Sequence, residues 1–425
     1  MAKKKTYEPL DLGALTMEVQ KALGNDETAM CGIEVPSLAL QYLLNSRVLP
    51  FSKMVEIFGA PGAGKSTFLY EIMRWSLQAN GFAYLGETEQ KDSVDIRRAI
   101  CKWNKSYLDR ITVKCDVTLE GWVNQLNEAI SHYDKLYEKY GPCIPVVYGI
   151  DAVTSAGTER AFEEFKDEGC GTERVAELAN RLTSYVRNFP GRIKDKPASL
   201  IFVNHAKQKI GATAGFGDEA ETPGGKAVKY YSLIRLELKY IGQDKRVNCT
   251  TRKIKIKVRK NGIQEAGKEM LVRLRYSKTP DPVDPEKSIL QVEWDWDTAD
   301  IEFLLDQLKG KEGGAERKKA VAAIIDLNET KLGTEGAVWS EALGIPEDEP
   351  VTIKEAGILL HKNTELMEKL RGFFLTTNSV CFAYGDNLTD LSEQAKKDED
   401  EHLQAISDAL YKDVVRDEIN FKEDN

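Results

Sequence analysis

The sequence predicts an α/β protein built on a mainly parallel, twisted sheet that is flanked by helices and bordered by antiparallel edge strands. Between Val48 and Tyr240, short apolar runs of strand character alternate with long amphipathic stretches, which is the pattern of βαβ units. From Leu233 onward, apolar and polar residues alternate with period two, as in antiparallel strands. At 425 residues the chain has room for two or three domains.

Changes in composition divide the chain into four segments. Apolar residues at helical spacing indicate a helical N-terminal part, which we interpret as an oligomerisation segment. A Pro-rich stretch ends the core and leads into a small α+β domain. The chain then becomes polar and acidic, which is typical of a solvated tail. The expected segments are 1–40, the core 41–280, the C-terminal domain 288–385 and the acidic tail 386–425.

Composition excludes several classes of protein. Hydrophobic residues make up 42% of the chain and charged residues 30%, as in an ordinary globular protein. Charged residues interrupt every apolar run and no apolar signal region follows the basic N-terminus, so we expect a cytoplasmic protein without a membrane partner. The seven cysteines form no CxxC pair and the four histidines form no cluster with them, which argues against zinc sites and disulfide frameworks.

The net charge of −9 is unevenly distributed along the chain. Residues 386–425 contain thirteen acidic and five basic side chains, whereas eight Lys and Arg residues fall within 245–260. A basic strand region therefore coexists with an acidic tail. The overall acidity does not by itself exclude a nucleic-acid partner.

The segment Gly59–Ser66, GAPGAGKS, has the sequence of a phosphate-binding loop. It lies between an apolar strand-like run and a helical pattern, which is the context that such a loop requires. Successive backbone N–H groups would surround a polyphosphate, Lys65 would reach its β- and γ-phosphates, and Ser66 would hold Mg²⁺. The expected nucleotide-binding residues are Gly59, Pro61, Gly62, Ala63, Gly64, Lys65, Ser66 and Thr67.

Two carboxylates stand where catalysis on a triphosphate would need them. Glu89 lies just past the expected second strand, where it could activate a water molecule against the γ-phosphate, and Glu87 is the competing candidate. Asp151 ends the apolar run that begins at Val146 and could bind Mg²⁺ through water.

Later motifs resemble the RecA recombinase family in their order along the chain. These are the strand 200–205, which ends in Asn204-His205, a Gly-rich loop, the block that begins at Gly224-Gly225, and the lysine-rich element around Lys260. The resemblance covers about 33–263. It implies that His205 lies where the family senses the γ-phosphate; bacterial members have Gln there, whereas phage recombinases of the UvsX type resemble this chain in having His. It also implies that Lys260 reaches a neighbouring subunit's nucleotide and stabilises transition-state charge there.

The same resemblance implies two DNA-binding loops, one within 159–171 and a second at 211–222. Three acidic residues in the second loop weaken a simple electrostatic argument for DNA, and flanking lysines partly restore it. Two positions depart from the family pattern, because Gly262 replaces a second interface lysine and Ile96 replaces an adenine-stacking tyrosine. The expected DNA-binding residues are Lys166, Lys207, Lys209, Gly211, Phe216, Gly224 and Gly225.

The implied activity is that of an ATP-dependent DNA recombinase. Such a protein polymerises on single-stranded DNA with ATP and Mg²⁺, pairs it with homologous duplex and exchanges strands, so a helical filament is expected. Single-strand-binding and loader proteins are expected partners, and the bacterial nucleoid or a phage-infected cytoplasm is the expected location. The alternative is a ring-forming motor or regulatory ATPase of related fold, similar to replicative helicases. The expected catalytic residues are Lys65, Glu89, His205 and Lys260.

Overall fold

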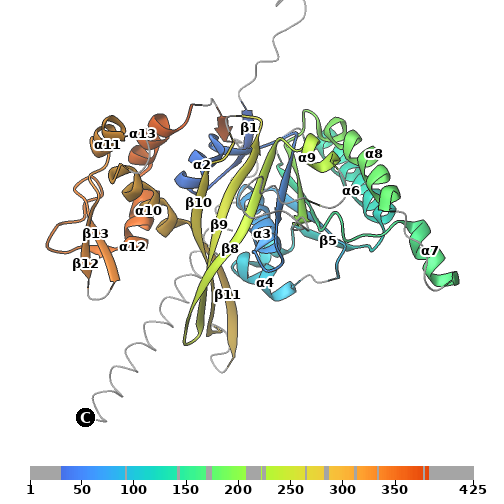
Figure 1. The fold of residues 1–425 in the computed structure, drawn as a ribbon, viewed down its shortest axis with the longest axis horizontal. Coiled ribbons are helices and arrows are strands. Elements are labelled where there is room, and N and C mark those ends of the chain that lie inside the picture. Colours follow the sequence, from blue (N-terminus) through green and yellow to red (C-terminus); the bar gives the residue numbers. More distant parts are fainter. Residues whose placement is uncertain are drawn as a thin grey trace, which may run out of the picture.

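A nine-stranded sheet forms the centre of the computed structural model (Figure 1). The model describes residues 30–90, 93–140, 144–168, 175–206, 222, 226–263, 266–281, 287–310, 314–332, 335–376 and 379–381. The strands are β3 (Lys53–Gly59), β4 (Phe82–Glu87), β5 (Ile111–Cys115), β6 (Val146–Asp151), β7 (Ala198–His205), β8 (Ile234–Arg246), β9 (Cys249–Asn261), β10 (Glu269–Pro280) and β11 (Ser288–Asp295).

The sheet order is β11-β10-β9-β8-β3-β7-β6-β4-β5. From β8 to β5 in this order all neighbours are parallel, whereas β9, β10 and β11 are each antiparallel to the strand before them. The predicted class, a mainly parallel α/β sheet with antiparallel strands toward one edge, is confirmed. The three central strands β3, β7 and β6 are nearly fully buried, as expected when helices cover both faces.

Helices cover the two faces of the sheet and form two hydrophobic cores. On one face, α3 (Lys65–Gln78), α4 (Val94–Ile100) and α5 (Lys105–Leu108) pack with alternate strand residues such as Val55. On the other face, α6 (Leu119–Tyr140) and α8 (Val175–Ile193) pack with the intervening residues such as Met54. Alternation of side chains along each strand divides the apolar residues between the two cores. Two further helices are α7 (Glu159–Glu168), which projects to one side in Figure 1, and α9 (Ala227–Tyr231).

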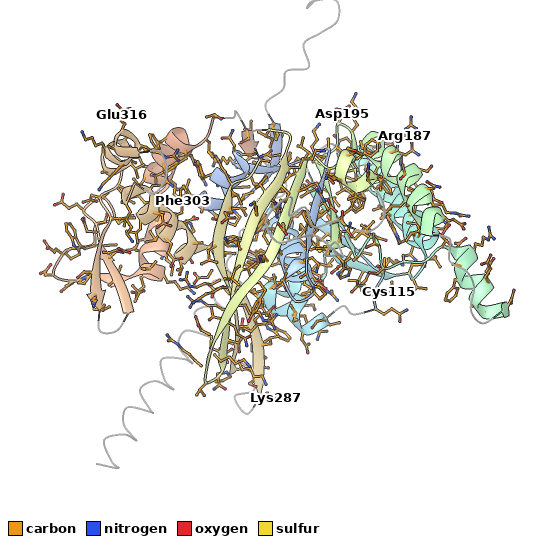
Figure 2. The ribbon with its side chains drawn as sticks, viewed as in Figure 1. Cys115, Arg187, Asp195, Lys287, Phe303 and Glu316 are labelled. Atoms are coloured by element: carbon orange, nitrogen blue, oxygen red, sulfur yellow. The ribbon has the colours of Figure 1, made fainter. Side chains whose placement is uncertain are left out.

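The core sheet extends past residue 280, where the sequence pattern placed the end of the core. β10 and β11 form an antiparallel hairpin in which Pro280 lies opposite Ser288. The Pro-rich stretch therefore connects two paired strands instead of separating two domains. The long strands β8–β11 project beyond the rest of the sheet, and Lys287 marks the end of this projection in Figure 2.

A smaller unit follows β11 and has its own hydrophobic core. The ring of Tyr42, on helix α2 (Leu38–Leu44), lies 5.1 Å from the ring of Phe303 in this unit, so the unit packs against the start of the described chain. The unit consists of α10 (Trp296–Leu308), α11 (Gly314–Ala322), β12 (Asn328–Leu332), β13 (Glu335–Trp339), β14 (Val351–Thr352), α12 (Ile353–Lys362) and α13 (Thr364–Phe374).

The two ends of the described chain meet in a small three-stranded sheet. β15 (Ser379–Cys381) pairs with β1 (Met30–Glu34), which pairs with β2 (Val48–Pro50), and α2 (Leu38–Leu44) lies between β1 and β2 in sequence. Residues 1–29, most of the expected oligomerisation segment, and the acidic tail 386–425 lie outside the described residues.

A fully buried carboxylate, Asp300, joins the small unit to α2. It accepts hydrogen bonds from the backbone N–H groups of Leu38 (2.8 Å) and Ala39 (2.9 Å) at the N-terminus of α2. The His361 Nε2 lies 2.8 Å from Asp300 and its Nδ1 lies 2.7 Å from Asp297. Burial alone would lower the pKa of His361, but the two carboxylates outweigh it and raise the pKa to about 10.

We predict that His361→Gln destabilises the protein by about 3 kcal/mol, because a buried carboxylate loses its cationic partner. The folded pKa lies above the unfolded value of 6.5, so this stabilisation is complete below about pH 6.5 and is lost as the pH rises toward 10. Urea unfolding of both proteins from pH 6 to 10 measures the difference, which should shrink steadily. A difference that does not vary with pH would show that His361 contributes by packing alone.

Candidate nucleotide-binding site

The Gly-rich loop connects the central strand β3 to the N-terminus of α3. Gly64 is the N-cap of α3 and has φ of 85°, and Gly62 has φ of 75°. Residues with a Cβ rarely adopt this backbone region, so both turns depend on glycine. The loop therefore presents the start of a fourteen-residue helix, where backbone N–H groups and the helix dipole favour an anion.

Lys65 is folded back over this loop and is 6% exposed. Its Nζ donates a hydrogen bond to the carbonyl of Ala60 at 2.9 Å. Burial lowers the pKa of Lys65 below its usual value, although Asp151 and Glu89 act in the opposite direction. The ammonium group thus lies among carboxylates at the expected phosphate position.

Asp151 is the last residue of β6 and accepts a hydrogen bond from the hydroxyl of Ser66. Burial raises the pKa of Asp151 to about 6, and Glu89 and Glu87 add to this increase, whereas Ser66 and Lys65 oppose it. A serine hydroxyl beside a carboxylate is an oxygen donor set of the kind that Mg²⁺ takes together with phosphate oxygens. Among the described residues no cluster of three His, Cys, Asp or Glu side chains forms an all-protein metal site.

Glu89 lies between two polar partners just beyond the end of β4. Its carboxylate contacts the Nε2 of His205 and accepts a hydrogen bond from the Ser155 hydroxyl at 2.5 Å. Glu87 differs, because it is the last residue of β4, lies opposite Asp151 in register and accepts the backbone N–H of Glu89 at 2.9 Å. The structure thus brings the side chains of Glu89 and His205 together, whereas Glu87 binds the backbone of Glu89.

A buried polar network lies beneath the site and was not anticipated from the sequence. Glu56 of β3 is fully buried, forms an ion pair with Arg235 of β8 and accepts the side-chain amide of Asn204 at 3.0 Å. Asn204 in turn accepts the Thr154 hydroxyl at 2.9 Å and the backbone N–H of His205 at 2.9 Å. The sequence contains one indication of this network, which is a single charged residue, Glu56, within the apolar run Met54–Phe58.

The structure does not bring Lys260 to the phosphate loop of its own chain. Lys260 lies on β9 opposite Arg235, which lies opposite Glu56, three residues before Gly59. Two strand spacings and three residues separate Lys260 from Gly59, a span of about 14 Å. Its Nζ donates hydrogen bonds to the carbonyls of Lys229 (3.1 Å) and Tyr230 (2.7 Å), and burial lowers the pKa of Lys260, with the charge of Arg235 adding to the effect.

The structure shows the surroundings of the two positions, Gly262 and Ile96, at which the chain departs from the family pattern. A Cβ on Gly262 would lie 2.4 Å from the Cδ1 of Leu233, so a lysine at this position requires that side chain to move. Ile96 packs against the hydrophobic core on the α3 face. Neither position therefore supplies the group that the resemblance implied.

Most of the expected DNA-binding residues lie outside the described part of the chain. Lys166 is described; it lies on α7 with its Nζ 4.7 Å from the centre of the Phe162 ring. The residues that lie outside are Lys207, Lys209, Gly211, Phe216, Gly224 and Gly225.

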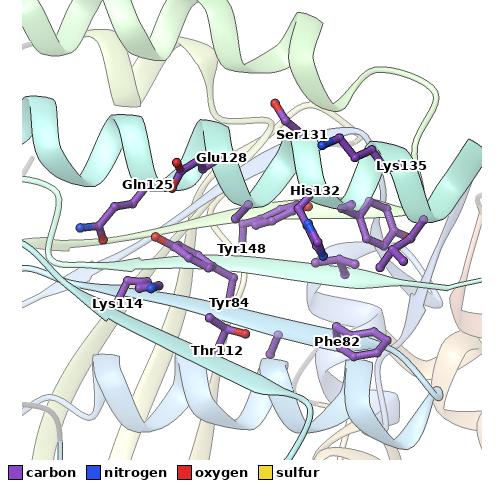
Figure 3. A pocket seen from close by; sticks show the side chains of 15 residues that line it. Phe82, Tyr84, Thr112, Lys114, Gln125, Glu128, Ser131, His132, Lys135 and Tyr148 are labelled. Atoms are coloured by element: carbon purple, nitrogen blue, oxygen red, sulfur yellow. The ribbon is translucent and has the colours of Figure 1, made fainter.

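A cavity of about 660 Å³ lies on the opposite face of the sheet from α3, between α6 and the strands β4, β5 and β6 (Figure 3). Tyr84 and Tyr148 line it, and burial raises the pKa of both phenols, so they remain neutral. None of its lining residues belongs to the expected nucleotide set. The cavity is therefore separate from the nucleotide site.

The fold and the convergence of a Gly-rich loop, a lysine and acidic residues at the carboxyl ends of parallel strands define a P-loop nucleotide-binding protein. The family model of the RecA N-terminal domain matches residues 16–280, and the chain belongs to this family. The predicted RecA-type resemblance is confirmed.

Curated relatives named Protein RecA are similar to the chain at low identity. The protein from Mycoplasma mobile is 26% identical over 275 residues, which cover 62% of this chain and 77% of the relative. The protein from Methylococcus capsulatus is 25% identical and the match covers 71% and 76%. The protein from Rubrobacter xylanophilus is 28% identical and the match covers 62% and 70%. In the described residues, no helix combines the length and apolarity needed to cross a bilayer.

We predict that Asp151→Asn stabilises the metal-free protein by roughly 1–3 kcal/mol at pH 7 while abolishing Mg²⁺-dependent nucleotide binding. The folded pKa of about 6 exceeds the unfolded value of 3.8, so wild-type stability falls as the pH rises through this interval. Asparagine removes the buried charge and hence the penalty. Unfolding in EDTA at pH 4 and pH 7 measures the effect, which should be small at pH 4. Equal stabilisation at both pH values would contradict this account.

Proposed function

We propose that this chain is an ATP-dependent DNA recombinase that polymerises on single-stranded DNA and promotes homologous pairing and strand exchange. Membership of the RecA family carries the recombinase and DNA-dependent ATPase assignment. The observation that supports it in the structure is the meeting of Lys65, Asp151, Glu89 and His205 at one edge of a RecA-type sheet.

The proposed reaction is attack of water on the γ-phosphoryl group of ATP, with release of ADP and phosphate. Glu89 accepts the proton of the attacking water, and Lys65 stabilises the charge that develops on the β- and γ-phosphate oxygens. Mg²⁺, held by Ser66 and through water by Asp151, would supply further charge neutralisation at the phosphates when bound. The buried position of these groups strengthens their electrostatic effect.

His205 would report the state of the nucleotide to the DNA. It ends β7, and the expected second DNA-binding loop follows it directly in sequence. Its contact with Glu89 joins this position to the water-activating group. A γ-phosphate would compete for the His205 N–H and thereby change the geometry at the start of the loop.

Assembly completes the proposed site. Subunits would associate head to tail through a heterologous interface that does not close, which generates a helical filament. Lys260 would then act on the nucleotide of the neighbouring subunit. The proposed partners are single-stranded and homologous duplex DNA, with single-strand-binding and loader proteins as accessory factors. The proposed location is the cytoplasm, and His205 supports a phage-infected cell over the nucleoid.

The alternative is a ring-forming RecA-fold motor, which would keep the same phosphate loop and carboxylates. Electron microscopy with ATP and single-stranded DNA, together with ATPase assays with and without that DNA, tests the two functions. We expect DNA-stimulated phosphate release and helical filaments, and loss of both in Lys65→Ala. Closed rings would favour the motor, and normal strand exchange by Lys65→Ala would refute the proposed site.

We predict that Glu89→Gln lowers the ATPase rate by roughly 10²–10⁴-fold while ATP-dependent DNA binding is retained, because only proton transfer is lost. Glu87→Gln is the matched control; it conserves the acceptor for the Glu89 backbone N–H and should reduce the rate far less. Steady-state phosphate release and DNA filter binding measure the two effects. If Glu87→Gln gives the larger loss of rate, then Glu87 is the residue that activates water.

A further inference from the structure

The first turns of α3 rest on a cluster of aromatic side chains supplied by β11, by the first residue of α10 and by α3 itself. The rings of Trp294 and Trp296 stack with centroids 5.7 Å apart and an interplanar angle of 12°. Phe68 lies 5.1 Å from Trp294, and Trp75 lies 6.2 Å from Trp296. Trp294 is 3% exposed and Trp296 is 5% exposed. The helix that carries the phosphate loop is therefore supported from behind by the last strand of the sheet.

Trp294 contacts the N-terminal end of α3 at two points. Its Nε1 donates a hydrogen bond to the carbonyl of Thr67 at 3.3 Å, within the first turn of α3. A Cβ added to Gly64 would lie 3.5 Å from the Cη2 of Trp294 and 3.4 Å from the Cδ2 of Leu274, so the indole edge and Leu274 line the N-cap. Leu274 of β10 lies directly opposite Trp294 of β11 in the hairpin. The hairpin thus contacts both the N-cap and the first turn of α3.

A second contact fixes the next turn of α3 through Glu71. This fully buried carboxylate accepts hydrogen bonds from the indole N–H groups of Trp75 (3.1 Å) and Trp296 (3.0 Å). Burial alone would raise the pKa of Glu71, but the charge of Arg74 and these hydrogen bonds outweigh it and hold the pKa below its usual value. Glu71 therefore stays ionised and attached to both tryptophans.

The same short segment begins the C-terminal unit. Asp295 lies between the two tryptophans, is fully buried and pairs with Arg275 of β10. Its side chain also accepts the backbone N–H of Thr298 at 3.2 Å as the N-cap of α10. Trp294 and Trp296, on either side of Asp295, thus form hydrogen bonds to α3, while Asp295 itself caps the N-terminus of α10.

We propose that Trp294 is a positioning residue for nucleotide binding, acting through the N-cap and first turn of α3. By bonding the Thr67 carbonyl and lying against Gly64, it holds the backbone N–H groups of the loop in the orientation that phosphates require. Because Asp295 joins the same segment to α10, the C-terminal unit is coupled to the phosphate loop. The inference rests on the proposal that Gly59–Ser66 binds the nucleotide.

The test compares Trp294→Phe with a matched control, Trp103→Phe. Phenylalanine at 294 keeps an aromatic ring beside Trp296 and Phe68 but lacks the indole N–H. Trp103 also donates its Nε1 to a backbone carbonyl, that of Leu290 on β11, at 2.9 Å. The control therefore also removes an indole-to-carbonyl hydrogen bond that involves β11, but one that does not touch the phosphate loop or α3.

Isothermal titration calorimetry with ADP and Mg²⁺ measures affinity, and thermal unfolding measures stability. We expect Trp294→Phe to weaken ADP binding by roughly three- to tenfold, the effect of losing one hydrogen bond. Trp103→Phe should change affinity by less than about twofold with a similar loss of thermal stability. ATPase turnover at saturating ATP should stay near the wild-type value in Trp103→Phe, because this residue bonds Leu290 and touches neither the phosphate loop nor the reacting groups.

An unchanged ADP affinity in Trp294→Phe, or an equal weakening in both variants, would overturn the positioning role. Trp294→Tyr, which also lacks the indole, must weaken binding in the same direction and provides a second folded variant. Lys65→Ala is included as a reference. Loss of ADP binding in Lys65→Ala confirms the nucleotide site itself, so an unaffected Trp294→Phe then counts against the positioning role alone.

Discussion

The buried ion pair between Glu56 and Arg235 is the interaction on which the rest of the architecture depends. It joins β3 to β8, the point where the parallel part of the sheet meets its antiparallel extension. Arg235 also lies over the Phe58 ring at 4.5 Å, and Asn204 binds the second carboxylate oxygen of Glu56. Removing one partner of such a pair typically costs about 3–5 kcal/mol, because the other charge stays buried. The ion pair and the Asn204 hydrogen bond therefore hold β7, β3 and β8 in fixed relative positions, and with them the side chains at the carboxyl ends of these strands.

Those strand ends concentrate opposed charges in a poorly solvated space. Burial raises the pKa of Asp151 and lowers that of Lys65, so each group is held in an environment that disfavours its charge. Two carboxylates, Asp151 and Glu89, act on the single ammonium of Lys65. The carboxylates therefore lack positive charge nearby, and the N-terminus of α3 lacks a negative charge. A magnesium–triphosphate complex supplies both. The site is therefore electrostatically incomplete by itself, which is the usual condition of a preorganised binding site.

Short sequence patterns were enough to predict candidate site residues that are close together in the chain. The phosphate loop, Asp151 and the choice between Glu89 and Glu87 all follow from residues that end a strand or begin a helix. The extent of the sheet was harder to predict, because a Pro-rich stretch reads as a linker although Pro280 pairs across a hairpin. The support from Trp294 depends on a contact between residues more than 200 positions apart. The spacing of apolar residues along the chain does not predict which distant side chain will pack against a given helix.

The position of Lys260 determines how a lysine on β9 could take part in nucleotide chemistry. About 14 Å separates its strand position from Gly59, roughly twice the reach of a lysine side chain, and its Nζ is bound to the carbonyls at the end of α9. The side chain therefore does not reach the phosphate loop of its own chain, and the proposed function assigns it to the nucleotide of a neighbouring subunit. The carbonyls that now hold it are weaker partners than a phosphate, and burial together with Arg235 already destabilises its charge. Contact with a neighbour's phosphates would relieve that cost, so nucleotide binding and subunit association would favour each other.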